Sequence, residues 1–525
     1  MEGVGQRDSM TSEWGWTSHP LSAWPSTLPE GQGGEWTGWS AVPKNNSSWP
    51  SERRKAVHQA LVQQYNQASL MPPTSLEALT SETCRVVTVG HQLVLAGGPA
   101  FFHHKVLSAI RTARQLMERW QVPVVPVFWL ASEDHDWKEV AAVHGAERPH
   151  VWEPLDADIP WPVGHRSLVG VREVLESWSS DGAPLDAVND MKADLATAEQ
   201  ANETLSGLMR RWIHRWYGQE GVLVLDADHP DLKTSASALW ASEFEGNGVH
   251  ASLIGTEAFQ GPAHVRENNV FWLGEQEGRV GVVRDADGDA WRAGTRRFTK
   301  SKEGWAHFAQ THAQSCSPGV LLRPLYQEWL LHSAAVVLGP GEWKYWHQLP
   351  QAFEDQGLVF PALRLRDHAV VLSEECHAVG WSLDQGWMTN EEWDRWVLDR
   401  WVDALGDEVR QHQSNLEAWN VNLQRWAAGM SPELKGPAGA LEAATAKAWK
   451  QWMSKLRKSL KGSKAKEWLA ARRACASLVR KGAPQDRWAN WHLLSGDDCD
   501  AWVQTWLEPE GGFEARVWCF GPTNG

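Results

Sequence analysis

Five consecutive polar residues, Ser132 to Asp136, stand at the end of a long apolar segment that begins at Val122. The block contains three carboxylates and one imidazole, and such a group could transfer a proton, hold an ammonium ion or bind an anion. A histidine flanked by carboxylates should have its protonated form favoured. Helix capping by Ser132 is one alternative, but a cap needs one residue and leaves His135 and Asp136 unexplained. A divalent metal on Asp134, His135 and Asp136 is disfavoured because consecutive residues rarely all reach one ion.

A second group of polar residues follows the apolar segment 84–89. Gly90, His91 and Gln92 come directly after it. Then Gly97, Gly98 and Pro99 precede a helix-forming stretch that carries His103, His104 and Lys105. Glycines at a helix start let the backbone approach a phosphate, although they could serve only as the helix entry. The pattern is neither GxGxxG nor a Walker loop, so it does not indicate a dinucleotide or P-loop site.

Both groups belong to a predicted parallel sheet. Apolar strands are expected at 84–89 and 124–130, within 221–233 and 333–346, and at 361–367. The helix between the first two strands makes a right-handed βαβ crossover, and ligands of such sheets bind outside the carboxyl ends of the strands. Later segments bring further polar groups to that edge: Asp226 and Asp228 after the third strand, Gly339, Gly341 and Glu342 after the fourth, and Arg323, Gln327 and Glu328 on the helix before it. The Gly-Pro-Gly-Glu segment could also be a plain tight turn.

The remaining segments surround this core, which we place at residues 51–382. Insertions are expected at about 143–207 and at 262–300, where alternation predicts antiparallel hairpins with a tight turn at 285–289. Residues 1–50 form an N-terminal arm, and 482–525 pack back on the core. In 383–481, apolar residues spaced by threes and fours predict two long helices separated by "GMSPELKGPAG". Such a helical hairpin exposes an apolar seam, which indicates a homodimer.

Composition narrows the class of protein. A net charge of −15 argues against a nucleic-acid partner or an anionic membrane. No apolar run approaches the roughly 18 to 20 residues of a membrane span, and no secretory signal is visible. The six cysteines form no CxxC pair, so we expect a cytoplasmic protein without a structural metal. The basic segment Lys447–Lys481 is either a solvated helix face or an electropositive surface for a nucleotide, tRNA or an acidic partner.

Several segments resemble the bacillithiol biosynthesis cysteine-adding enzymes, the BshC family of cysteine ligases. The resemblance rests on "VVTVGHQLVLAGGPAFFHHKVLSAI", "PVVPVFWLASEDHDWKEV", "LLRPLYQEWLL", "LGPGEWKYW" and "PQDRWANW". It covers the chain from about residue 58 onward. The family has Gly-Gln-Gln where this chain has Gly90-His91-Gln92, and a tyrosine where it has His103. These departures leave open a paralogue with another substrate.

The resemblance implies a Rossmann-like core similar to class I aminoacyl-tRNA synthetases and nucleotidylyltransferases, with connecting-peptide insertions and a C-terminal coiled coil that forms a dimer. The implied activity is a carbon–nitrogen ligase that adds cysteine to the amine of glucosaminyl-malate. We expect ATP, accompanied by Mg²⁺, to activate cysteine as cysteinyl-AMP. The alternatives are a non-catalytic dimeric nucleotide-binding scaffold and a nucleotidylyltransferase acting on another sugar or acid.

Roles follow for the residues at the strand ends. Glu133, Asp134, His135 and Asp136 are the expected catalytic residues, with His135 or Glu133 taking the proton of the incoming amine. Lys105 or Arg323 would neutralise developing negative charge. The expected substrate and nucleotide contacts are Gly90, His91, Gln92, Gly97, Gly98, Lys105, Ser132, Asp226, Arg323, Gln327, Glu328, Gly339, Gly341, Glu342 and Tyr345.

Overall fold

The computed structural model describes residues 14–19, 39–41, 43–45, 48–286, 290–300, 302–495, 499–507 and 516–522. The chain divides into two compact units. One consists of Trp16–Ala369 and Asp486–Cys519, and the other of Met1–Gly15, Val370–Gln485 and Phe520–Gly525. Most of the predicted N-terminal arm lies outside the described residues, and the predicted domain limits stay predictions.

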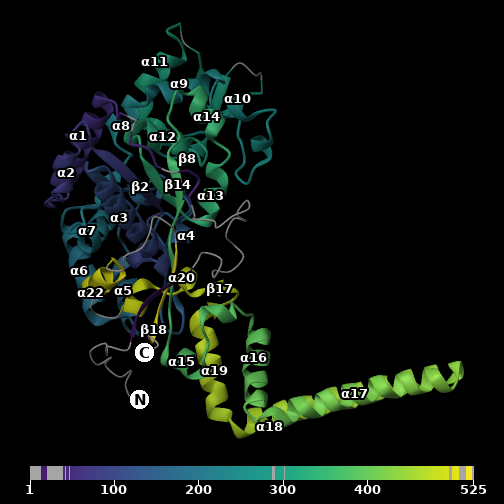
Figure 1. Ribbon diagram of the computed structural model, residues 1–525. Helices are drawn as coiled ribbons and strands as arrows, with labels where there is room; N and C mark the ends of the chain where they lie inside the picture. The colour runs from purple at the N-terminus through teal and green to yellow at the C-terminus, as the bar shows by residue number, and fades with distance from the viewer. Residues whose placement is uncertain are drawn as a thin grey trace. The chain divides into compact units, whose positions relative to one another are not determined.

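A five-stranded parallel sheet forms the centre of the first unit, with strand order β14-β13-β2-β3-β6 (Figure 1). The strands are β2 (Arg85–His91), β3 (Val124–Leu130), β6 (Leu223–Asp226), β13 (Ala335–Leu338) and β14 (Ala362–Leu365). Every neighbouring pair is parallel, so all carboxyl ends lie along one edge of the sheet. The predicted α/β class with a Rossmann-like parallel core is confirmed.

Helices cover both faces of this sheet, which explains why its strands are apolar without alternation. All seven residues of β3 are buried. On one face, Val127 belongs to a cluster with Leu61 of α1 (Ser51–Gln67) and Leu325 of α12 (Leu322–Leu331). On the other face, the ring of Phe128 lies 5.6 Å from that of Phe102 in α3 (Ala100–Trp120), measured between centroids. Because α3 connects β2 to β3, the predicted crossover is present.

The segment between β3 and β6 contains a short antiparallel hairpin followed by helices. Its elements are α4 (Trp137–Val140), β4 (Ala142–His144), β5 (Pro149–Val151), α5 (Val171–Ser179), α6 (Leu185–Gln200) and α7 (Leu205–Tyr217). The hairpin is β4 with β5, and α5, α6 and α7 contact one another in sequence.

The segment between β6 and β13 begins and ends with helices and contains two small sheets. Its helices are α8 (Pro230–Ser235), α9 (Ser237–Glu245), α10 (Val249–Leu253), α11 (Gly304–Thr311) and α12. Its strands are β7 (Val270–Gly274), β8 (Gly278–Gly281), β9 (Val283–Arg284), β10 (Ala290–Ala293), β11 (Arg296–Thr299) and β12 (Cys316–Pro318). They pair antiparallel in the orders β12-β7-β8 and β11-β10-β9, as the alternation predicted. Residues 287–289 of the predicted tight turn lie outside the described residues.

Short elements complete the first unit. They are α2 (Ser75–Ala78), α13 (Pro340–Trp346), α14 (Pro350–Asp355), α21 (Trp491–Ser495) and α22 (Cys499–Leu507). α20 (Gln485–Trp488) begins at the unit boundary. A further three-stranded sheet has the order β1-β18-β15, with β1 (Trp14–His19), β15 (His368–Val371) and β18 (Val517–Pro522), and each of these strands includes a boundary between the two units.

The second unit is mostly helical, and each of the two predicted long helices is interrupted once. Four helices replace them: α16 (Asn390–Asp403), α17 (Asp407–Met430), α18 (Lys435–Ser463) and α19 (Ala465–Leu478). Gly406, at a φ of 103°, ends the continuity between α16 and α17. α18 starts earlier than predicted because Pro437 lies in its first turn, where the missing N–H breaks no helical hydrogen bond. α15 (Glu374–Val379), β16 (Val479–Arg480) and β17 (Ala483–Pro484) complete the unit.

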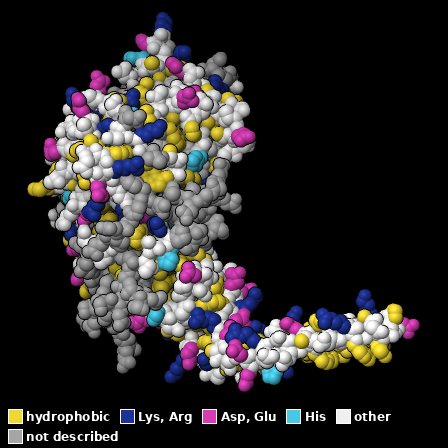
Figure 2. Space-filling model, viewed as in Figure 1, with side chains coloured by type: hydrophobic (Ala, Val, Ile, Leu, Met, Phe, Trp, Pro, Cys, Tyr) yellow, Lys and Arg dark blue, Asp and Glu magenta, His cyan; other side chains and the backbone are white. Residues whose placement is uncertain are grey.

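α17 and α18 form the predicted helical hairpin, and apolar side chains on it face solvent. Trp426 is 59% exposed and Met430 is 65% exposed. Figure 2 shows hydrophobic side chains gathered near the free end of this hairpin. Three arginines of the basic segment form ion pairs within the unit, those of Arg457 with Asp399, Arg472 with Asp394 and Arg473 with Glu375. The homodimer stays a prediction. No helix in the described ranges is long and apolar enough to cross a membrane.

Candidate active site

A cavity of about 640 Å³ opens at the carboxyl edge of the parallel sheet, within the first unit. This volume is typical of small-molecule sites. Its walls come from the segments that follow β2, β3, β13 and β14, from α12, and from the antiparallel insertion. Residues far apart in the sequence therefore meet at the edge where parallel α/β sheets bind ligands.

The cavity contains most of the residues that the sequence singled out. Its wall includes Gly90, His91, Gln92, Lys105, Ser132, Glu133, Asp134, His135, Arg323, Gly339, Gly341, Glu342 and Tyr345. Six predicted residues are not part of it: Asp136, Gly97, Gly98, Asp226, Gln327 and Glu328. Whether the wall residues act on a ligand stays a prediction.

Gly97 and Gly98 have a structural reason to be glycine. Both are buried, with φ angles of +76° and +56°. A β-carbon on Gly97 would lie 2.5 Å from His103 Nε2, and one on Gly98 would lie 2.6 Å from the β-carbon of Val94. Neither glycine is part of the cavity wall, and their expected approach to a phosphate stays a prediction.

The other residues outside the wall support it or face solvent. Ser132 Oγ donates to Asp226 Oδ1 at 2.5 Å, which joins the ends of β3 and β6. Gln327 accepts a hydrogen bond from Arg323 Nη1 at 2.8 Å. Glu328 accepts from the Ser333 backbone N–H, and burial raises the pKa of Glu328 to about 7. Asp136 is exposed and precedes α4.

Asp134 is held as an anion at the rim. Its carboxylate accepts hydrogen bonds from Gln92 Nε2 at 2.8 Å and from the backbone N–H of His135 at 2.7 Å. Burial opposes ionisation, but the Gln92 bond and the Arg279 charge together lower the pKa of Asp134. An ionised carboxylate at this place can hold an ammonium group or sugar hydroxyls.

His135 is not favoured in its protonated form, so the sequence-based expectation for its charge is wrong. Burial and the nearby Arg279 lower the pKa of His135, and they outweigh the charges of Asp134 and Asp136. Arg279 Nη1 donates to His135 Nδ1 at 3.0 Å. That hydrogen bond requires a neutral ring whose other nitrogen carries the proton.

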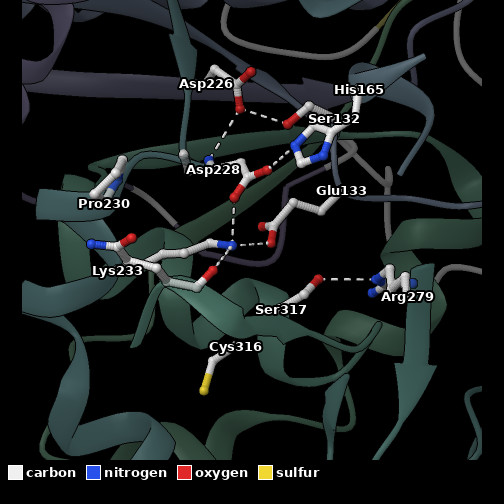
Figure 3. Close-up of polar contacts among 12 residues, drawn as sticks. Ser132, Glu133, His165, Asp226, Asp228, Pro230, Lys233, Arg279, Cys316 and Ser317 are labelled. Carbon is white, nitrogen blue, oxygen red and sulfur yellow. Dashed lines mark hydrogen bonds and ion pairs between the residues drawn. The ribbon is translucent and has the colours of Figure 1, made fainter. Parts of the chain in front are cut away.

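Glu133 lies in the cavity wall and belongs to a chain of charged side chains (Figure 3). Lys233 Nζ lies 2.7 Å from Glu133 Oε1 and 2.5 Å from Asp228 Oδ1, and Asp228 also pairs with His165. Burial raises the pKa of Glu133 although Lys233 opposes the shift. For Lys233, burial is outweighed by the two carboxylates, which raise its pKa. Glu133 is therefore a carboxylate at the wall with an increased affinity for a proton.

A second cluster lies after β2 and β13. Lys105 Nζ donates to the Gly90 carbonyl and pairs with Glu342, which also accepts from the Gly339 backbone N–H at 2.8 Å. Arg323 Nη2 donates to the Tyr345 hydroxyl at 3.1 Å. Burial, followed by the Lys105 charge, lowers the pKa of His91 to about 4, so His91 is neutral.

Sequence reasoning missed several charged groups of this site. Lys233 and His165 lie in the chain of Figure 3, and Arg266, Arg279, Arg366 and Arg487 line the cavity. Lys233 closes the segment "LDADHPDLK" and could have been noticed there. The arginines carried no local signal because they come from an insertion and from the C-terminal side of the core. Arg366 is held by Asp486 at 2.7 Å.

The cavity as a whole is positively charged. Six cationic side chains line it against three carboxylates, those of Glu133, Asp134 and Glu342. Among the described residues, no group of three or more His, Cys, Asp or Glu side chains is placed to hold a metal ion. The arrangement suits an anionic ligand that also carries a group able to contact a buried carboxylate.

Comparison with known proteins gives one consistent result. Residues 37–367 match the family model "Bacillithiol biosynthesis BshC, N-terminal Rossmann-like domain". Relatives named "Putative cysteine ligase BshC" include those of Flavobacterium johnsoniae, Cytophaga hutchinsonii and Geobacillus thermodenitrificans. They are 26%, 30% and 25% identical over 64%, 57% and 80% of this chain. The matches span 63%, 56% and 81% of the relatives' own lengths.

A solved structure is also similar over much of its length. It is named "putative arginyl t-RNA synthetase", from Campylobacter jejuni, and the match covers 88% of this chain and 99% of that chain. The TM-score is 0.26 at 10% sequence identity.

Proposed function

Because the chain belongs to the BshC family of bacillithiol biosynthesis, we propose that it is a carbon–nitrogen ligase that joins the carboxyl group of cysteine to the amine of glucosaminyl-malate. The product is bacillithiol. ATP supplies the activation, by converting the cysteine carboxylate into a mixed anhydride with AMP and releasing pyrophosphate, and Mg²⁺ accompanies the nucleotide. The amine then attacks the activated carbonyl and AMP leaves.

The observation that carries this proposal is the cavity in which a cation-rich wall meets Glu133 and Asp134. The amine of glucosaminyl-malate arrives as an ammonium ion, which Asp134 can hold. It must lose a proton before it attacks, and a buried carboxylate with a raised pKa is suited to accept that proton. We therefore assign Glu133 as the general base. The neutral His135, whose Nδ1 accepts from Arg279, is not the base.

Three residues of the cavity wall, Arg323 of α12, Gly341 after β13 and Arg487 of α20, fit the phosphates of ATP. Arg323 lines the cavity, and its hydrogen-bond partners among the described residues are the neutral side chains of Gln327 and Tyr345. Arg487 also lines it and forms no ion pair with another described residue. A β-carbon on Gly341 would meet no atom within 4 Å, so the space beside this backbone is open. Arg323 and Arg487 would neutralise charge that develops on the departing phosphate.

The test uses the purified chain with glucosaminyl-malate, cysteine and ATP, followed by mass spectrometry of thiols and nucleotides. We expect bacillithiol and AMP to form in equal amounts. Asp134→Asn should abolish the product, whereas Asp136→Asn, a neighbouring exposed carboxylate, should leave it unchanged. A non-catalytic scaffold would form no product with any nucleotide, and a nucleotidylyltransferase would consume ATP without cysteine.

We also propose that the chain forms a homodimer through the α17–α18 hairpin and works in the cytoplasm. Support for the dimer comes from large apolar side chains exposed on one hairpin, among them Trp419, Trp426 and Met430. Exposed apolar patches of this kind mark protein interaction sites. Support for the cytoplasm comes from four buried cysteines that are free thiols, Cys84, Cys316, Cys376 and Cys475.

A further inference from the structure

Arg279 is a buried cation whose guanidinium forms no ion pair with a carboxylate of the described residues, although the charges of Glu133 and Asp134 act on it from beyond 4 Å. Its side chain comes from β8 and is hidden from solvent except for its edge on the cavity. Nε donates to Ser317 Oγ at 2.9 Å, Nη2 to the Pro318 carbonyl at 2.7 Å and Nη1 to His135 Nδ1 at 3.0 Å. Figure 3 shows the guanidinium directed at Ser317. All three acceptors are neutral, and no carboxylate of the described residues lies within 4 Å of this guanidinium.

A buried charge without a counter-ion is expensive, and proteins keep one only where an anion binds or where function requires it. The neighbouring carboxylates are already used. Glu133 pairs with Lys233, and Asp134 accepts from Gln92 and from backbone N–H groups. The charge of Arg279 is therefore available to a ligand in the cavity.

Arg266 is a second arginine of the cavity wall that has no anionic partner among the described residues. Both guanidinium groups pack on the ring of Phe271, with Cζ to centroid distances of 4.9 Å for Arg266 and 4.0 Å for Arg279. Arg266 is half-buried, lines the cavity, and forms no hydrogen bond or ion pair through its side chain with any described residue. Because both guanidinium groups pack on this ring, they lie near each other, and such a pair suits a ligand that presents two carboxylates.

We propose that Arg266 and Arg279 bind the two malate carboxylates of the substrate and so determine its specificity for a dicarboxylate. This inference rests on the proposed ligase function and deepens it. His135 acts as a positioning residue, because its Nδ1 holds Nη1 of Arg279. With the malate end at the insertion, the sugar amine lies toward Glu133 and Asp134. Arg323 and Arg487 remain for the nucleotide.

The inference predicts a dependence on ligand charge that a structural role would not produce. Glucosaminyl-malate and its dimethyl ester, which lacks both negative charges, are titrated by calorimetry into the wild type, Arg266→Gln and Arg279→Gln. The control is Arg292→Gln, an exposed arginine of the same insertion that does not line the cavity. We expect the wild type and the control to prefer the diacid. Each cavity variant should lose about ten- to a hundredfold in affinity for the diacid and little for the ester.

Other outcomes separate this inference from the proposed function. If Arg266→Gln bound the diacid as well as the wild type, or weakened diacid and ester equally, the dicarboxylate assignment would be wrong while the ligase activity stood. If the variants raised the KM for ATP instead, the two arginines would serve a phosphate. A wild type that bound neither compound would refute the ligase proposal and this inference together. If Arg279→Gln fails to fold, the binding measurements on Arg266→Gln test the dicarboxylate assignment, because Arg266 is only half-buried.

Discussion

Replacing Lys233 by methionine is the sharpest test of how the candidate site is built. Methionine keeps an unbranched apolar stem but removes the ammonium group that lies 2.7 Å from Glu133 and 2.5 Å from Asp228. The side chain of Lys233 is 1% exposed, and those of the two carboxylates are 11% exposed. Removing one partner of a buried ion pair leaves an uncompensated charge and costs about 3–5 kcal/mol.

We expect a value near the lower end of that range. Asp228 keeps His165 as a partner, and Glu133 can escape by taking up a proton. Lys192→Met is the matched control, because Lys192 pairs with Glu176 at 4.0 Å and both are partly exposed. Exposed pairs of this kind contribute about 0–1 kcal/mol.

The assay is urea unfolding followed by tryptophan fluorescence, for which the 36 tryptophans give a strong signal. The double variant Glu133→Gln with Lys233→Met should recover part of the loss, with a coupling free energy of about 0.5–3 kcal/mol. In Lys233→Met alone, the pKa of Glu133 should rise further, so the acid limb of the kcat profile should move to higher pH. The reasoning fails if Lys233→Met destabilises the chain no more than Lys192→Met does.

Three further results are expected. Glu133→Gln should lower kcat by about 10²- to 10⁴-fold, since it removes the proposed base, and an unchanged kcat would reject that role. The urea midpoint should also fall, because Lys233 then keeps only Asp228 as a carboxylate partner. The free energy of unfolding should fall as the pH drops from about 6.5 towards 4, because four buried histidines stay neutral in the folded chain and become protonated in the unfolded chain. Each of these histidines should lower the free energy of unfolding by about 2 kcal/mol at pH 5. These are His91, His104, His368 and His492, with folded pKa values of about 4, 3, 4 and 3; a urea midpoint that stayed constant between pH 7.5 and 5 would contradict their burial. Trp426→Glu should halve the mass found by light scattering if the hairpin forms the dimer, and an unchanged mass would place the interface elsewhere.

Much of the fold was predictable because its signals are local. β3 has the bounds that its apolar run predicted, and α3 begins at Ala100, directly after Pro99. Parallel strands need a crossover, and the chain order of strand, helix and strand supplies one. The C-terminal helices were harder. Their apolar spacing continues across Gly406, so only the positive φ at that glycine reveals the break.

The candidate site divides in the same way. Glu133 and Asp134 could be recognised because they follow a strand, and strand ends in a parallel sheet share one edge. Arg266 and Arg279 could not be recognised from the sequence. They belong to an insertion in which apolar and polar residues alternate, and that pattern does not indicate which side chains point toward the sheet. The charge of His135 was predicted wrongly for a related reason. Its sequence neighbours are carboxylates, but its hydrogen-bond partner is Arg279, 144 residues away.

The sequence by itself determined the class of fold, the edge of the sheet at which polar groups gather and the family to which they point. Those properties depend on hydrophobic periodicity and on residue order, and both can be read from the local sequence. Only the tertiary structure decided which charges stand alone, which histidines are neutral and which glycines serve the backbone rather than a ligand. Charge interactions depend on distance and burial, and both arise only when remote segments have packed together.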